Sequence, residues 1–204
     1  MFMRNIKFVI FTLLLIAATL TAQTARINTP APDFELKDNT GTSHKLSDFK
    51  GQIVVLEWVN YQCPFVKKHY GSENMQKLQK AYTEKDVVWL SICSSAEGNQ
   101  GYFEGEELTE QIKKSGSNAT AYLTDSQGTV GKMYGAKNTP HMFIIDSAGT
   151  LVYAGGIDDI RSTDQADIPK AKNYIKSALD ELLAGSKVSN QSTQPYGCSV
   201  KYAD

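Results

Sequence analysis

The stretch "IVVLEWVNYQCPFVKK" (residues 53–68) joins a predicted strand to a predicted helix, with one cysteine, Cys63, at the junction. Its first half is a nearly unbroken run of apolar and β-branched residues, which is typical of a strand buried on both faces of a sheet. From Pro64 to about Lys85 apolar residues recur at helical spacing, so we expect a helix there. Cys63 should therefore lie just past the carboxyl end of a central strand, where ligands and chemistry gather in such sheets.

The rest of the chain predicts further strands and helices in alternation. In chain order these are a lead-in with a short hairpin (29–52), a strand (86–93), a short helix near 107–114, a strand (120–125), a short helix (128–135), a β-hairpin (141–156) and an amphipathic helix (168–185) with Pro169 in its first turn. The expected fold class is α/β, with a central mixed sheet flanked by helices and an N-terminal β-hairpin extension. This domain spans 26–186, and a linker with a cysteine-containing tail follows at 187–204.

The amino terminus predicts export. Residues 1–25 have a basic start, an apolar stretch and then small residues, which is the order of a secretory signal peptide. An uncleaved anchor is the alternative, but the apolar core is short against the roughly 20 residues that span a bilayer. We therefore expect a periplasmic or secreted protein without a stable membrane anchor.

The composition fits one globular domain without a nucleic-acid partner. The chain has 204 residues, of which 41% are hydrophobic, enough for a single domain with a real core. Without residues 1–25, 19 basic and 22 acidic residues remain, for a net charge near −3. This balance does not resemble a nucleic-acid footprint. Export permits disulfides, and three cysteines allow at most one intramolecular bridge.

Cys63 is the first candidate for chemistry. At a helix N-terminus the free backbone N–H groups and the helix dipole favour a thiolate, which lowers the thiol pKa and makes the sulfur a nucleophile. Lys67, one turn on, adds positive charge. The alternative is an inert buried thiol, but such a cysteine is more expected inside a strand, as with Cys93, which we interpret as core.

Two more positions stand out near this junction. Glu57 interrupts an apolar strand, so its carboxyl is either desolvated, with a raised pKa and a use in proton exchange, or exposed to solvent or a lysine. Pro140 immediately precedes a predicted strand, an awkward place that a cis Thr139–Pro140 bond would suit.

Cys198, in "YGCSVKY", follows a linker that we expect to be flexible. It could resolve an oxidised Cys63 or close a permanent bridge to it. A metal site would need Cys63 with His69 or His141, but no histidine pair has ligand spacing. We therefore expect no metal.

These motifs resemble the thioredoxin superfamily. The strand–cysteine–helix unit, "NTP" before the hairpin and the terminal helix carry the general resemblance. The stretch from "APDFEL" (31–36) through "CPFVKKHYGS" (63–72) is similar to the redoxin group, the alkyl hydroperoxide reductase/thiol-specific antioxidant (AhpC/TSA) domain. Within it, the chain resembles exported peroxiredoxin-like proteins with "CPFVKKHY" and a terminal "GCSVKY". The resemblance covers about residues 28–204.

The resemblance implies a thioredoxin-like fold and roles for individual residues. Cys63 falls at the nucleophilic first cysteine of the thioredoxin Cys-x-x-Cys motif. Thr139 and Pro140 match the Thr–cis-Pro that faces this cysteine, and Glu57 matches the buried acid that handles protons.

The chain also departs from the family pattern. The second cysteine of the motif is Val66. Leu56 and Asn60 replace the Pro and the Thr or Ser that help peroxiredoxins bind peroxide.

We expect an exported thiol oxidoreductase in which Cys63 attacks a protein disulfide or reduces a small peroxide. Cys198 would be its resolving partner, and a thiol donor would supply electrons. No cofactor is implied. The alternative is a redox-inactive binding module in which a structural Cys63–Cys198 disulfide pins the tail.

Overall fold

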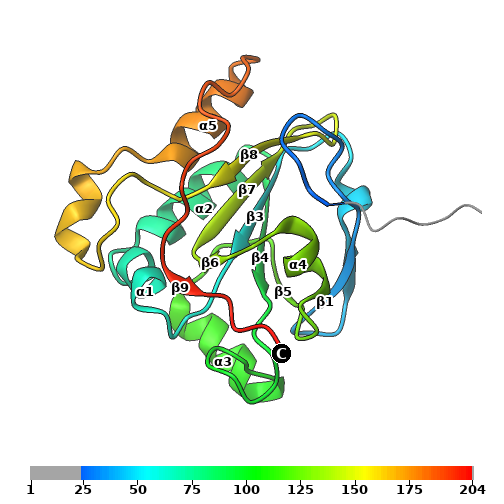
Figure 1. The fold of residues 1–204 in the computed structure, drawn as a ribbon, viewed down its shortest axis with the longest axis vertical. Coiled ribbons are helices and arrows are strands. Elements are labelled where there is room, and N and C mark those ends of the chain that lie inside the picture. Colours follow the sequence, from blue (N-terminus) through cyan, green and yellow to red (C-terminus); the bar gives the residue numbers. More distant parts are fainter. Residues whose placement is uncertain (1–23, 204) are drawn as a thin grey trace, which may run out of the picture.

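A computed structural model describes residues 24–203, so nearly all of the predicted signal peptide lies outside the described residues. Seven strands form one sheet in the order β2-β1-β5-β4-β3-β7-β8 (Figure 1). Their bounds are β1 (Glu35–Asp38), β2 (Ser43–Lys45), β3 (Val54–Trp58), β4 (Val88–Cys93), β5 (Ala121–Thr124), β7 (His141–Ile145) and β8 (Leu151–Gly155). A separate two-stranded sheet joins β6 (Asn138–Thr139) to β9 (Cys198–Ser199).

The main sheet is mixed, as predicted. β3, β4 and β5 run parallel, whereas β7 pairs antiparallel with both β3 and β8. The lead-in forms the predicted hairpin, since β1 pairs antiparallel with β2 and also with β5. β3 is therefore a central strand between β4 and β7, and its carboxyl end leads directly to Cys63.

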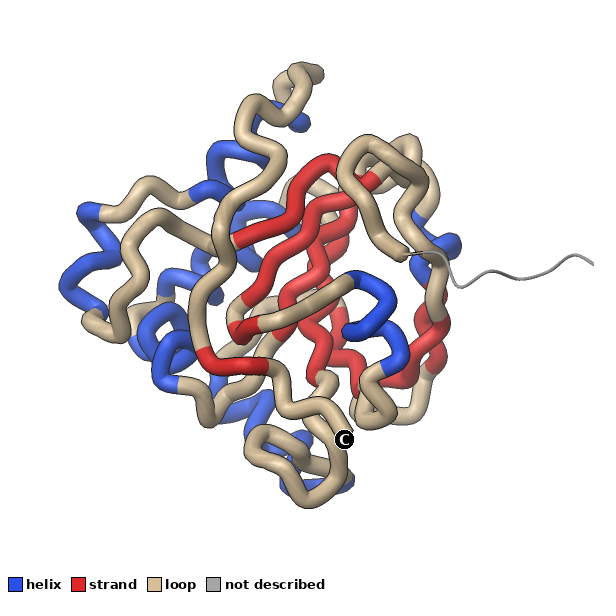
Figure 2. The backbone as a smooth tube through the Cα atoms, viewed as in Figure 1, coloured by secondary structure: helices blue, strands red, loops and turns tan. Residues whose placement is uncertain are grey.

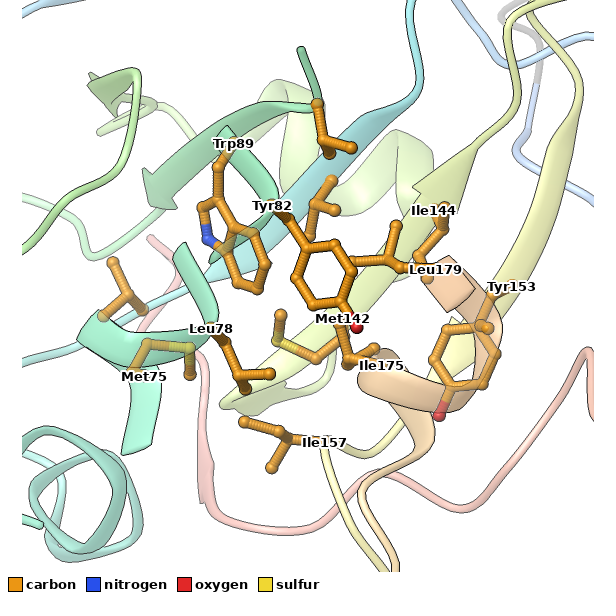
Figure 3. Packing of buried hydrophobic residues seen from close by; sticks show 14 of the residues in the cluster. Met75, Leu78, Tyr82, Trp89, Met142, Ile144, Tyr153, Ile157, Ile175 and Leu179 are labelled. Carbon is orange, nitrogen blue, oxygen red and sulfur yellow. The ribbon is translucent and has the colours of Figure 1, made fainter. Parts of the chain in front are cut away.

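Helices cover both faces of the sheet. They are α1 (Pro64–Gly71), α2 (Asn74–Thr83), α3 (Gly105–Ser115), α4 (Thr129–Tyr134) and α5 (Tyr174–Leu183), with 3₁₀ helices at Leu46–Phe49 and Gln165–Lys170. One hydrophobic cluster packs α1, α2, α3 and α5 on a face of the sheet, and a second packs α4 on the other. Figure 3 shows the first cluster, where Tyr82, Met142 and Leu179 meet. Because both faces are covered, β3 is apolar at every position except Glu57.

The helix predicted from Pro64 to Lys85 is two helices. α1 ends at Gly71, and Glu73, with a φ of 59°, adopts the left-handed conformation before α2 begins. Ser72 donates its hydroxyl to the Lys68 carbonyl at 2.7 Å. A Cβ at Gly71 would lie 2.6 Å from the Gln165 amide nitrogen, so the glycine allows a close approach. The prediction of one continuous helix was wrong because apolar spacing does not reveal the left-handed conformation of Glu73.

The predicted helix over 168–185 also starts too early. Pro169 lies inside the 3₁₀ helix Gln165–Lys170, and α5 begins only at Tyr174. The Asn173 side chain accepts a hydrogen bond from the Lys176 N–H and so caps α5. A capping side chain rather than the proline therefore fixes the start of this helix.

The tail is docked against the domain, which corrects the expectation of a flexible linker. It runs from α5 past β8 and β6 toward the carboxyl terminus (Figures 1 and 2). Ser192 forms a parallel bridge with Ala154 of β8, and Val188 and Tyr196 are buried. Within residues 24–203, no helix combines the length and apolarity needed to cross a membrane.

Candidate functional site

Cys63 is the N-cap residue of α1, with Pro64 in the first helical turn, as the sequence predicted. The Cys63 N–H donates to the Asn60 carbonyl at 2.9 Å, and its own carbonyl accepts from the Lys67 N–H at 2.9 Å. The side chain of Cys63 is 0% exposed. Val66, at the place of a second motif cysteine, is buried in the core. The strand end and the helix start thus fix the sulfur at the edge of the sheet.

Thr139 and Pro140 face this cysteine. The Thr139–Pro140 peptide bond is cis, which confirms the predicted conformation. The Cys63 thiol donates to the Thr139 carbonyl, with 3.2 Å between sulfur and oxygen. Thr139 belongs to β6, so its backbone is extended beside the thiol.

Cys198 completes a pair of thiols. Its Sγ lies 2.7 Å from the Cys63 Sγ, and both cysteines are free. In the register of the small sheet Cys198 is the antiparallel partner of Thr139. The structure therefore brings together Cys63, Thr139, Pro140 and Cys198, although Cys198 lies in the carboxyl-terminal tail.

The two thiols differ in acidity. Burial alone would raise the pKa of Cys63, but hydrogen bonds from the Cys198 thiol and the Val66 backbone N–H outweigh it, and the pKa is lowered. Burial, the bond to Cys63 and the Cys63 charge raise the pKa of Cys198 to about 11. Cys63 is therefore the first of the pair to become a thiolate, and the Cys198 S–H then donates to it.

Glu57 is buried, so the solvent-exposed alternative was wrong. Its Oε1 accepts from the Tyr70 hydroxyl, and its Oε2 accepts from Gln79, Trp89 and Ser91. Burial raises the pKa of Glu57 above its usual range, and the four hydrogen bonds oppose this rise. All four bonds join Glu57 to the two helices above it and to β4, and none of them reaches a sulfur.

Sequence reasoning missed a buried polar cluster beside the site. Lys68, His69, Asp158 and Tyr196 are all buried and contact one another. The sequence singled out Lys67, but Lys67 is exposed and Lys68 points inward. The adjacent "KK" gave no local signal for which lysine is buried, because the acidic partner lies 90 residues away in the sequence.

The other residues that the sequence singled out, Cys93 and Asn60, are held by hydrogen bonds to backbone groups. Cys93 is buried and its thiol donates to the Gly101 carbonyl at 3.4 Å, in agreement with a core role. Among the residues that the structure describes, no group of three His, Cys, Asp or Glu side chains is arranged to hold a metal. Asn60, at the place of the peroxiredoxin Thr or Ser, donates to the Gln100 carbonyl and accepts from the Gln62 N–H.

A mixed sheet with a cysteine at a helix N-cap, facing a cis proline, defines a thioredoxin-like protein. Residues 27–154 match the AhpC/TSA family, and the chain belongs to this family. It is thus a redoxin of the thioredoxin superfamily, a group of thiol oxidoreductases.

Known proteins with similar sequences include the glutathione peroxidase-like peroxiredoxin 2 of Saccharomyces cerevisiae. It is 28% identical over 137 residues, which cover 59% of this chain and 83% of the yeast protein. The thioredoxin-like protein YneN of Bacillus subtilis is 29% identical over 125 residues, 59% of this chain and 66% of that protein.

Solved structures are similar over most of the chain. An uncharacterized conserved protein from Geobacillus kaustophilus has a TM-score of 0.77 at 30% identity, covering 87% of this chain and 93% of that one. A hypothetical protein from Sinorhizobium meliloti has a TM-score of 0.74 at 27% identity, covering 89% and 97%. A protein described as a thiol:disulfide interchange protein DsbE from Chlorobium tepidum shares the fold, with a TM-score of 0.52 at 23% identity, covering 64% and 85%.

Proposed function

We propose that this protein is an exported thiol oxidoreductase in which Cys63 is the nucleophile and Cys198 the resolving thiol. The observation that carries the proposal is the 2.7 Å contact between the two sulfurs, with the Cys63 pKa lowered and the Cys198 pKa raised. A nucleophilic thiolate next to a protonated partner is the arrangement that thiol–disulfide exchange requires. The predicted signal peptide supports export to the periplasm or beyond.

The substrate that fits best is a protein disulfide. The Cys63 thiolate attacks one sulfur of the substrate, the substrate S–S bond breaks, and the other sulfur leaves as a thiolate. Cys198 then loses its proton and attacks the Cys63 sulfur, so that the substrate leaves fully reduced and a Cys63–Cys198 disulfide forms. An external dithiol donor returns the pair to its reduced state.

Peroxide reduction is the second reaction to test, because a relative is a peroxiredoxin by name. The Cys63 thiolate would cleave the O–O bond and become a sulfenic acid, with release of an alcohol or water. Condensation of this sulfenic acid with the Cys198 thiol would give the Cys63–Cys198 disulfide and one water. The Asn60 side chain already has two backbone partners, which favours disulfide exchange over fast peroxide reduction.

Three residues would support Cys63 in this scheme. The Thr139 carbonyl and the cis Pro140 would shape the face that receives the substrate sulfur. Glu57, with its raised pKa, would exchange protons from its buried position in β3. No organic cofactor or metal enters the scheme.

Turnover of two substrates tests the proposal. The wild type, Cys63→Ser and Cys198→Ser are assayed with insulin, a protein disulfide that dithiothreitol alone reduces slowly, and with a hydroperoxide, each with dithiothreitol as donor. We expect Cys63→Ser to lose turnover, and Cys198→Ser incubated with the disulfide substrate without dithiothreitol to accumulate a mixed disulfide at Cys63, visible by mass spectrometry. Wild-type turnover no faster than that of Cys63→Ser would refute the proposed enzymatic activity.

The binding-module alternative predicts a different redox behaviour. A permanent Cys63–Cys198 bridge would titrate below about −300 mV, whereas an exchanging pair lies higher. A titration in dithiothreitol buffers of graded ratio, read by alkylation and mass spectrometry, separates the two.

A further inference from the structure

The Tyr196 side chain occupies a buried polar pocket two residues before Cys198. Its hydroxyl donates to Asp158 Oδ1 in a short hydrogen bond and lies 3.2 Å from His69 Nε2. Phe65 packs edge-on against the Tyr196 ring, with 5.8 Å between ring centroids. The tail is therefore inserted into the domain at this point.

The pocket is built around a buried ion pair. Lys68 Nζ lies 3.5 Å from Asp158 Oδ2 and donates to the Ile160 carbonyl at 2.8 Å. It also lies 5.6 Å from the centre of the Tyr196 ring. Buried charges are costly unless they are paired and hydrogen-bonded. Here the Tyr196 hydroxyl supplies one of the hydrogen bonds that the Asp158 carboxylate needs.

His69 contributes as a neutral group. Burial and the neighbouring Lys68 charge lower the pKa of His69 to about 3. The Asn74 side-chain amide lies 2.9 Å from His69 Nδ1 and donates to it, which leaves the proton on Nε2. The imidazole N–H then donates to the Tyr196 hydroxyl while that hydroxyl donates to Asp158. The hydroxyl is thus held from both sides.

This pocket determines where Cys198 lies. Tyr196 and Cys198 are separated only by Gly197, whose carbonyl accepts from the Asn138 side-chain amide at 2.9 Å. Gly197 has a φ of 130°, and a Cβ there would lie 2.0 Å from the Thr139 carbonyl oxygen. Because only one residue separates them, the place of the Tyr196 ring restricts where Cys198 can lie. Cys198 in turn contacts the fully buried Cys63.

We propose that Tyr196, seated in the Lys68–Asp158–His69 pocket, is a positioning residue that holds Cys198 on Cys63 and keeps the tail closed over the site. The inference rests on the proposed function, in which Cys198 resolves Cys63. Any substrate larger than a proton reaches Cys63 only after the tail opens, so the pocket also sets how often Cys63 becomes accessible. The residues of the pocket act through Cys198 and do not touch the reacting sulfur themselves.

Site-resolved alkylation measures this opening. Cys198→Ser is the background for every variant, so that iodoacetamide can label only Cys63 and the core thiol Cys93. Labelling of Cys63 requires the tail to open, whereas labelling of Cys93 reports opening of the core. Tyr196→Phe keeps the ring and removes the hydroxyl. Because hydrogen bonds to charged groups shift equilibria by about tenfold or more, we expect Cys63 labelling to accelerate by about that factor while Cys93 labelling stays unchanged.

Tyr82→Phe is the matched control. The Tyr82 hydroxyl also donates to a carboxylate, Asp180, at 2.8 Å, but between α2 and α5. The Tyr82→Phe substitution should leave the ratio of Cys63 to Cys93 labelling at the value of the Cys198→Ser background. An unchanged ratio in Tyr196→Phe, or an equal rise in Tyr82→Phe, would overturn the positioning role.

A double variant adds a second criterion. Asp158→Asn and Tyr196→Phe weaken the same hydrogen bond, so their combined effect on labelling should be smaller than the product of the two separate effects. If the double variant instead shows the full product of the two effects, Tyr196 acts independently of its bond to Asp158, which would contradict the proposal. None of these readouts requires turnover, so failure of the positioning role and failure of the enzymatic role are distinguishable.

Discussion

The sulfur atoms of Cys63 and Cys198 lie 2.7 Å apart although 135 positions separate them in the sequence. Cys63 is buried at the start of α1, whereas Cys198 is partly exposed in the two-residue strand β9. The Thr139 backbone lies beside both, as the acceptor for Cys63 and the strand partner of Cys198. The site is therefore an asymmetric thiol pair formed by a helix N-terminus and a docked tail.

The asymmetry predicts the pH profile of Cys63. Replacing Cys198 by alanine removes the strongest of the hydrogen bonds that lower the Cys63 pKa, so this pKa should rise toward the ordinary thiol range. The pH dependence of Cys63 alkylation, followed by peptide mass spectrometry in the two proteins, measures the shift. Cys93→Ala is the control and should leave the Cys63 profile in place. A profile that moves to lower pH in Cys198→Ala would contradict the hydrogen-bond assignment.

Gly197 is predicted to be essential for tail docking. Gly197→Ala would bring a Cβ to 2.0 Å from the Thr139 carbonyl oxygen and would force a positive φ on a non-glycine residue. We expect β9 to separate from β6, with faster hydrogen–deuterium exchange over residues 196–202 and a loss of about 1 kcal/mol or more in the free energy of unfolding. Gly98→Ala, also at positive φ but with nothing within 4 Å of the new Cβ, should leave exchange in the tail unchanged.

Glu57 should make stability depend on pH. Its folded-state pKa is raised, so the native protein binds more protons than the unfolded chain just above the usual carboxyl pKa of about 4.3. The free energy of unfolding therefore falls as the pH rises from that value through the raised pKa. Glu57→Gln should flatten this fall, as urea denaturation from pH 4 to pH 8 would reveal. An identical slope in both proteins would show that Glu57 remains ionised in the fold.

Two leucines of α5 should differ in their contribution to stability. Leu179 is 0% exposed within the cluster of Figure 3, whereas Leu183 is 41% exposed. Leu179→Ala should cost about 2–5 kcal/mol in the free energy of unfolding, because it leaves a cavity in a packed core. Leu183→Ala should change it by less than about 0.5 kcal/mol. Similar losses for both, measured by urea denaturation, would mean that α5 is not held by this face.

Much of the fold followed from local patterns in the sequence. The apolar run of β3 and the helix that starts at Pro64 placed Cys63 at a strand–helix junction, and the structure places it at the N-cap of α1. Periodicity and proline positions are local signals, and they survive folding because each strand and helix buries the face that its own sequence makes apolar. The mixed character of the sheet followed from the alternation of these elements and the hairpin, whereas the strand order came only from the structure.

Local patterns also failed in identifiable places. The break between α1 and α2 lies at Glu73, which adopts a left-handed conformation, and α5 begins at the Asn173 cap. Both features lie where a helical pattern continues in the sequence. A hydrophobic period cannot report a residue in a left-handed conformation or show which side chain caps a helix.

The sequence by itself determined that Cys63 lies at a strand–helix junction, and it singled out Glu57 and Thr139–Pro140 while leaving the burial of Glu57 open. Only the tertiary structure decided that Cys198 reaches Cys63, that Lys68 rather than Lys67 is buried, and that Tyr196 enters a buried polar pocket. The physical reason is that these last relationships are contacts between segments far apart in the chain. These contacts depend on pairing the buried Lys68 charge with Asp158 and on burying the Tyr196 ring. Neither can be deduced from neighbouring residues in the sequence.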